Sequence, residues 1–222
     1  MSAIQNSIKN GILALSLLLI SGSQAVANTS TQAPDDLLKS ATIEMLHSIN
    51  KHRSEIKQSP KKLNSLVEQI ILPHLDFIAA SKIVMGKYWR TADKKQKIAF
   101  IRQFRLLLLR FYSSALAEYL SGNEKALPDD LIKYFPIKLA DGETSLTVRA
   151  ELMPESGQKI PIFYRVHLTS KGWKIYDVAV EGISMITTYK TNFATQFKTQ
   201  GIDALIASLE EKNKQMLANN KK

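Results

Sequence analysis

An α+β fold is predicted by two changes in the hydrophobic period along the chain. Apolar residues recur at helical spacing from about residue 35 to residue 122 and again from residue 183 onward. Between about 131 and 180 they alternate with polar residues, which is typical of strands with one wet face. Because short turns separate these strands, we expect helices packed on a small twisted antiparallel sheet.

Three helices are predicted before the longest one. The first spans residues 35–59 and stops at Pro60, the second spans 61–72 and stops at Pro73, and the third spans about 76–84. In each segment the apolar residues fall on one face at helical spacing. Each helix is therefore expected to bury one side.

The longest helix is predicted to open at Thr91 and Asp93 and to end at Gly122. Its apolar residues form one broad stripe that includes aromatic side chains, from Ile98 to Tyr119. A helix of this length measures roughly 40 Å at about 1.5 Å per residue, so it would span a small domain.

Four strands are predicted after Pro128. They are a short strand within 131–139 and longer strands at 146–152, 160–169 and 173–180. The last of these is apolar on both faces and is expected to lie inside the sheet.

The chain is predicted to be helical again from Ile183 to the end. Gly201 would interrupt this stretch, and Asp203 is expected to cap the final helix.

The first residues are typical of an export signal. Lys9 precedes an apolar run at 11–20, and Ala25-Val26-Ala27 provides small residues for cleavage before Asn28. An N-terminal membrane anchor is the alternative, but the run is much shorter than the roughly 20 residues that span a bilayer. We therefore predict a cleaved signal peptide at 1–27, a single domain at 28–222 and a periplasmic location.

Composition excludes several classes of site. The chain has no cysteine, so it has no disulfide, thiol nucleophile or lipidated cysteine. Its net charge is +10, and basic residues are dense between Lys82 and Arg110. Export and the lack of a nucleic-acid-binding motif argue against a nucleic-acid partner. The basic stretch could instead favour anionic membrane surfaces, favour an acidic docking partner, or form an ordinary solvated helix face.

The sequence carries no motif for an enzyme, metal or cofactor. His47 and His52 are five residues apart, which does not fit the helical zinc pair, and no HExxH, P-loop, GxGxxG or GxSxG pattern occurs. Asp177 is expected to be a structural hydrogen-bond acceptor. An envelope hydrolase that uses Asp177 with His167 is kept as a less favoured hypothesis.

The segment 173–193, WKIYDVAVEGISMITTYKTNF, carries a resemblance to a known family. It resembles the hallmark of the toluene-tolerance family, the MlaC-type periplasmic phospholipid-binding proteins. The segments 73–77, 84–89, 96–104 and 201–206 are also similar and occur in the expected order. The resemblance covers nearly all of the chain after the signal.

This resemblance implies a carrier with no catalytic step and no cofactor. Such a protein encloses phospholipid acyl chains in an apolar cavity. It shuttles lipid between an outer-membrane Mla lipoprotein–porin complex and an inner-membrane Mla ABC transporter complex, which maintains outer-membrane lipid asymmetry. Docking would be transient and the chain monomeric. The alternatives are a periplasmic binding protein for a quinone, a sterol-like solute or a fatty acid, and a purely structural adaptor.

With the resemblance, the space between the sheet and the long helix becomes the expected lipid pocket. Its predicted lining is Met85, Trp89, Phe104, Leu108, Phe111, Leu146, Val148, Ala150, Leu152, Ile162, Tyr164 and Val166. Lys82, Lys87 and Arg90 are the candidates for contacting a lipid headgroup or a docking partner. These apolar faces could also pack on each other and leave no void.

Overall fold

The computed structural model describes residues 32–154 and 157–219. Its N-terminal helices differ from the predicted ones. The signal peptide predicted at 1–27 lies outside these residues. The helix expected at 35–59 is broken at His52, where φ is −104° and ψ is 19°, into α1 (Pro34–Lys51) and α2 (Arg53–Gln58). Pro60 is the first residue of α3 (Pro60–Leu66), a position where its missing N–H costs nothing.

The helix predicted at 61–72 changes its winding after α3. It becomes a π-helix, η1 (Val67–Ile71), and then a 3-10 turn, η2 (Leu72–His74). Leu75 next forms a parallel bridge with Ile175, and the N–H of Asp76 donates to the Ile175 carbonyl at 2.7 Å. This change of path brings the chain to the sheet before the next helix begins.

Helix α4 (Phe77–Met85) is capped by Asp76, whose carboxylate accepts a hydrogen bond from the Ala79 N–H at 2.8 Å. It ends at Gly86, whose φ of +55° is an angle that glycine adopts without steric cost. A single turn, α5 (Tyr88–Thr91), follows and was not predicted.

The prediction of one long helix is confirmed by α6 (Lys94–Gly122), which has 29 residues. Its start is a capping box. The Asp93 carboxylate accepts from the Gln96 N–H at 2.8 Å, and the Gln96 side chain accepts from the Asp93 N–H at 3.1 Å.

The antiparallel sheet is confirmed, with strands in chain order. It consists of β1 (Ile132–Tyr134), β2 (Ser145–Leu152), β3 (Ile160–Thr169), β4 (Gly172–Val180) and β5 (Ile183–Ser184). The register shifts between Arg165 and Val166 opposite β4. Strand β5 occupies residues where the sequence predicted the start of a helix.

The last two helices are α7 (Met185–Thr199) and α8 (Gly201–Asn219). Asp203 lies in the first turn of α8, and its carboxylate accepts a hydrogen bond from the Gln96 side chain of α6 at 3.0 Å. Asp203 therefore ties α8 to the start of α6, and the expectation that it caps α8 is wrong.

Three clusters of buried side chains hold these elements together. One joins α1 to the sheet through Leu38, Val148, Val166, Trp173 and Ile175. A second joins α4, α6, α7 and α8 around Phe100, Phe104, Phe193, Phe197 and Leu205. The third joins α1, α2 and α3 to the end of α6 through residues such as Ile49, Ile56, Leu63 and Leu120.

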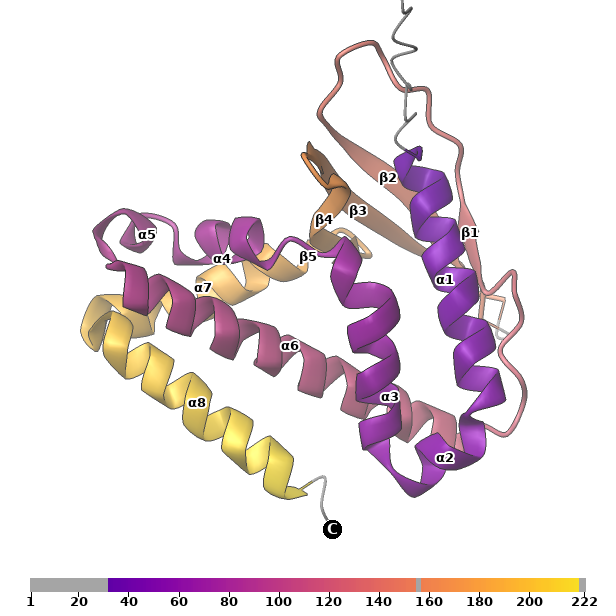
Figure 1. The fold of residues 1–222 in the computed structure, drawn as a ribbon, viewed down its shortest axis with the longest axis horizontal. Helices are drawn as coiled ribbons and strands as arrows, with labels where there is room; N and C mark the ends of the chain where they lie inside the picture. The colour runs from indigo at the N-terminus through magenta and orange to yellow at the C-terminus, as the bar shows by residue number, and fades with distance from the viewer. Residues whose placement is uncertain (1–31, 155–156, 220–222) are drawn as a thin grey trace, which may run out of the picture. The chain divides into compact units, whose positions relative to one another are not determined.

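Helix α1 rather than α6 therefore covers the buried face of the sheet. In Figure 1, α8 runs beside α6, and α1 lies against the sheet. The middle of α6 borders the sheet at Leu108, which lines one pocket together with Ile175 and Val178 of β4 and Met185 of α7.

Within the part of the chain that the structure describes, no helix has both the length and the apolar character needed to cross a membrane.

Candidate functional site

An apolar pocket lies where the middle of α6 faces η1, η2, β4 and the start of α7. It consists of two adjoining spaces of about 200 and 70 Å³. Both spaces are lined by Leu75, Phe77, Leu108 and Met185. We call this pair of spaces the apolar pocket.

The larger space is lined almost entirely by hydrocarbon. Its walls are Val67 and Ile71 of η1, Leu72 of η2, and Leu109, Tyr112, Ser113 and Leu116 of α6, together with the four shared residues. The π-helix contributes to this wall directly, and such turns are frequent at functional sites. An interior of this kind accepts alkyl chains and disfavours charged groups.

The smaller space is bordered by two carboxylates whose oxygens already have partners. Asp177, 4% exposed, accepts from the Ser184 hydroxyl at 2.7 Å and from the Ile186 N–H at 3.1 Å. The other carboxylate, that of Asp76, is hydrogen-bonded to the Ala79 N–H and to the His167 ring. These contacts direct the charges away from an apolar ligand.

Asp177 fastens strand β4 to the start of α7. Ser184, which donates to Asp177, also caps α7 by accepting from the Thr187 N–H at 3.0 Å. Arg165 lies 3.5 Å from the same carboxylate. His167 instead bonds Asp76 at 2.9 Å. The two residues of the hydrolase hypothesis thus belong to separate hydrogen-bond networks.

Two neighbouring tyrosines, one of which lines the pocket, stay neutral. Tyr112 lines the larger space, and Tyr189 of α7 lies close to it. Burial raises the pKa of Tyr112, and burial together with the neighbouring phenol raises the pKa of Tyr189 further. The rim therefore adds no negative charge at any physiological pH.

The residues predicted on the long helix and beside it are divided among different surroundings. Leu108 lines both spaces of the apolar pocket. Phe104 and Met85 are buried in the aromatic cluster between α4, α6 and α7. Phe111 is 49% exposed and contacts the Tyr112 ring, whereas Trp89 lines a different pocket described below.

The predicted sheet residues lie mostly under α1. Val148, Ala150, Ile162 and Val166 are buried, and Leu146, Leu152 and Tyr164 are half-buried. Leu146, Val148, Tyr164 and Val166 belong to the cluster that contains Leu38. The structure thus brings this set together with one another and with α1. Their role in binding a ligand stays a prediction.

Ten residues that line the larger space were not identified from the sequence as pocket residues. They are Val67, Ile71, Leu72, Leu75, Phe77, Leu109, Tyr112, Ser113, Leu116 and Met185. Leu75, Phe77 and Met185 fall within the segments that carry the family resemblance, so this resemblance was the available signal. No hydrophobic period could separate the others from ordinary core residues.

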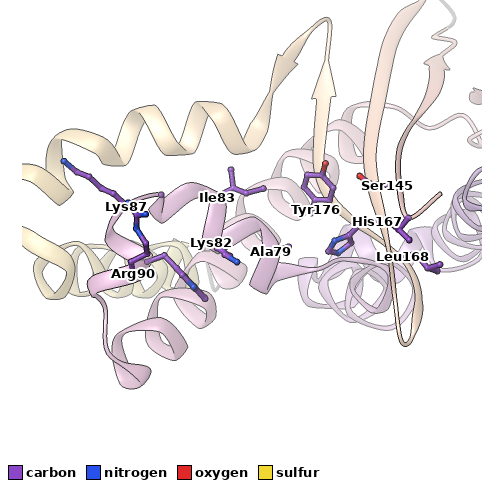
Figure 2. A pocket seen from close by; sticks show the side chains of 12 residues that line it. Ala79, Lys82, Ile83, Lys87, Arg90, Ser145, His167, Leu168 and Tyr176 are labelled. Carbon is purple, nitrogen blue, oxygen red and sulfur yellow. The ribbon is translucent and has the colours of Figure 1, made fainter. Parts of the chain in front are cut away.

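A second, open pocket is rich in positive charge. It measures about 790 Å³ and lies between α4 and α5 on one side and strands β2, β3 and β4 on the other. Figure 2 shows Lys82, Lys87 and Arg90 on the helical side, with His167 and Tyr176 opposite. We call it the cationic groove. Lys82, Lys87 and Arg90, which the sequence analysis named as candidates for contacting a headgroup or a docking partner, all line this groove.

The charges of the groove are not neutralised within the described residues. Lys82, Lys87 and Arg90 form no ion pair with any acidic side chain there. The groove also exposes hydrocarbon, since Ile83 and Leu168 are each 38% exposed. A neighbouring pocket of about 440 Å³ shares Lys87 and adds Lys190 and Lys198. Such a surface attracts anionic partners.

Among the described residues, no three His, Asp or Glu side chains gather in a way that could hold a metal ion.

Known proteins resemble this chain over most of its length. The family model described as MlaC protein matches residues 39–211. The intermembrane phospholipid transport system binding protein MlaC of Haemophilus influenzae is 27% identical over 190 residues, which are 84% of each chain. The toluene tolerance protein ttg2D of Pseudomonas putida is 27% identical over 193 residues, or 86% of each.

A solved structure is also similar. It is a phospholipid-binding protein of Ralstonia solanacearum in complex with a phospholipid, with a TM-score of 0.70 and 29% identity. The match covers 82% of this chain and 98% of the other. The family match over residues 39–211 includes all the residues that line the apolar pocket.

Proposed function

This chain belongs to the MlaC family, and we propose that it is a periplasmic carrier that encloses the acyl chains of a phospholipid. It moves the lipid between an outer-membrane Mla lipoprotein–porin complex and an inner-membrane Mla ABC transporter complex, and so maintains outer-membrane lipid asymmetry. It has no catalytic step. The observation that carries the proposal is the likeness to a protein solved with a bound phospholipid, at 29% identity over 82% of this chain.

The physical need for such a carrier is large. A diacyl phospholipid has about 30 methylene groups, and exposing each to water costs about 0.8 kcal/mol, or roughly 24 kcal/mol in total. Unassisted crossing of an aqueous compartment is therefore negligible. A protein that surrounds the chains with hydrocarbon removes most of this cost, as the walls of the apolar pocket would.

The pocket must widen to accept acyl chains. Its spaces of about 200 and 70 Å³ fall below the roughly 300–1,000 Å³ of ordinary ligand sites. Phe77, Leu108 and Met185 are only half-buried, so they can move without breaking a close-packed core. We infer that these three side chains swing aside when lipid enters.

The cationic groove serves to bring the carrier to anionic surfaces. Membranes present acidic headgroups, and a docking complex with an acidic face would present the same charge. Because Lys82, Lys87 and Arg90 are exposed, they act on encounter rather than by holding the enclosed lipid.

Reversing these three charges is expected to slow the uptake of lipid. The variant with Lys82→Glu, Lys87→Glu and Arg90→Glu should take fluorescent phospholipid from anionic vesicles about tenfold more slowly than the natural protein, and its rate should depend less on salt. The matched control reverses Lys51, Lys61 and Lys212, three exposed lysines outside the groove. Equal rates in the two variants would contradict a role for the groove.

The carrier function itself is tested by transfer between membranes. Donor vesicles with labelled phospholipid and unlabelled acceptor vesicles are mixed with purified protein, and movement of the label is followed over time. We expect the transfer rate to rise in proportion to protein concentration. A rate that stays at the level without protein would contradict the proposal.

A further inference from the structure

One polar group in the wall of the apolar pocket has no partner. Ser113 of α6 is 2% exposed and lines the larger space. Its hydroxyl is buried and forms no hydrogen bond with any of the described residues. It lies four residues after Leu109 and three before Leu116, so all three point from one face of α6 into the pocket.

Several helical hydroxyls among the described residues bond a backbone carbonyl. Thr188, Thr191 and Thr199 each donate to the carbonyl four residues earlier, at 2.8 to 3.0 Å. Ser113 makes no such bond to Leu109. A buried hydroxyl without a partner is costly, and each one in a natural protein calls for an explanation.

We propose that the Ser113 hydroxyl donates a hydrogen bond to an ester carbonyl oxygen of the enclosed phospholipid. This inference rests on the proposed function and names one contact within it. A phosphate or charged headgroup would be strongly disfavoured between Leu109 and Leu116. The ester carbonyls are neutral acceptors, and they join the acyl chains directly.

The position of Ser113 suits a group near the mouth of the pocket. The adjacent Tyr112 also lines the pocket and is 43% exposed, so the wall reaches solvent within one residue of Ser113. An ester held at Ser113 leaves the headgroup close to water while the chain extends along the apolar wall. Ser113 then sets both the depth of the lipid and a preference for acyl over alkyl chains.

Ser81 provides a matched control. It lies in α4, is 0% exposed, and its hydroxyl also has no partner among the described residues. Unlike Ser113, it does not line the apolar pocket. Ser81→Ala and Ser113→Ala thus make the same chemical change, but only one of them makes it at the proposed contact.

The experiment is a competition between two lipids that differ only in the carbonyl. The whole protein without its predicted signal peptide is incubated with vesicles that contain equal amounts of dipalmitoyl phosphatidylglycerol and its dihexadecyl ether analogue. The protein is repurified, and the bound lipids are extracted and counted by mass spectrometry. We expect the natural protein to recover the diacyl lipid in about three- to tenfold excess, the range that one neutral hydrogen bond supports.

Ser113→Ala should bring the ratio of diacyl to ether lipid close to one. Ser81→Ala should preserve the ratio, and so should Ser113→Thr, because threonine keeps a hydroxyl. Equal recovery of both lipids by the natural protein, or an unchanged ratio in Ser113→Ala, would overturn the Ser113 contact and leave the carrier function standing. Recovery of neither lipid by the natural protein would instead contradict the proposed function.

Discussion

Replacing Leu108 by tryptophan is expected to abolish lipid uptake while the protein stays folded. Leu108 lines both spaces of the apolar pocket, which total more than the volume added by the larger side chain. Because the indole would enter existing space, the change should cost less than the 1–3 kcal/mol that is typical of overpacking. The measurements are lipid phosphorus per protein after incubation with vesicles and the midpoint of thermal unfolding.

Leu107→Trp is the matched control for this experiment. Leu107 is the preceding residue, is 3% exposed, and lies in the aromatic cluster between α4, α6 and α7. The same substitution there should destabilise the protein by about 1–3 kcal/mol, and the folded fraction should still take up lipid. If Leu108→Trp is as unstable as Leu107→Trp and keeps its lipid, the space at Leu108 is not the binding pocket.

Asp177→Ala is expected to lower the free energy of unfolding by about 2–3 kcal/mol. The change leaves the Ser184 hydroxyl and the Ile186 N–H without their acceptor at the start of α7, and an orphaned buried donor costs about 1–3 kcal/mol. Arg165 is half-exposed, so loss of its ion pair adds little. For a chain of this size, the melting temperature should fall by roughly 4–12 °C.

Two further variants separate a structural role of Asp177 from a catalytic one. Ser184→Ala removes one of the hydrogen bonds and the cap of α7, so it should cost about 1 kcal/mol. Asp177→Asn retains one acceptor oxygen and should fall between the other two. An unchanged melting temperature in Asp177→Ala, together with loss of a hydrolytic turnover, would favour the envelope hydrolase.

The long regular elements could be predicted from the sequence. Helix α6 has many turns of one apolar stripe and a capping box, so its local signals agree with one another. Strands β2, β3 and β4 combine a period of two with short turns. The short elements α5 and β5 were missed because they have only 4 and 2 residues. Each contains about one period of its pattern, which is too little to recognise. The break at His52 carries no glycine or proline signal.

The site could be predicted only in part, because a hydrophobic period identifies a buried face but not the neighbour that covers it. Phe104, Leu108 and Phe111 belong to one apolar stripe. In the fold, Phe104 meets α7, Leu108 meets the pocket and Phe111 faces solvent. Val67 and Ile71 enter the pocket because the helix changes to π winding there, which depends on tertiary packing.

The same limit applies to the sheet. Its apolar residues were expected to face the long helix, but α1 covers Val148 and Val166 instead. The cations of the groove were easier to identify. Lys82, Lys87 and Arg90 lie close together in the sequence, so one helix and one turn place them on the same side.

The most direct test of the carrier function is the organic extract of the protein purified from the cells that naturally produce it. Mass spectrometry and phosphorus analysis of the extract identify what the pocket carries. We predict glycerophospholipids with two acyl chains, and their loss from Leu108→Trp. A protein that is consistently empty, or that carries a quinone, a sterol-like solute or a free fatty acid in their place, would contradict it.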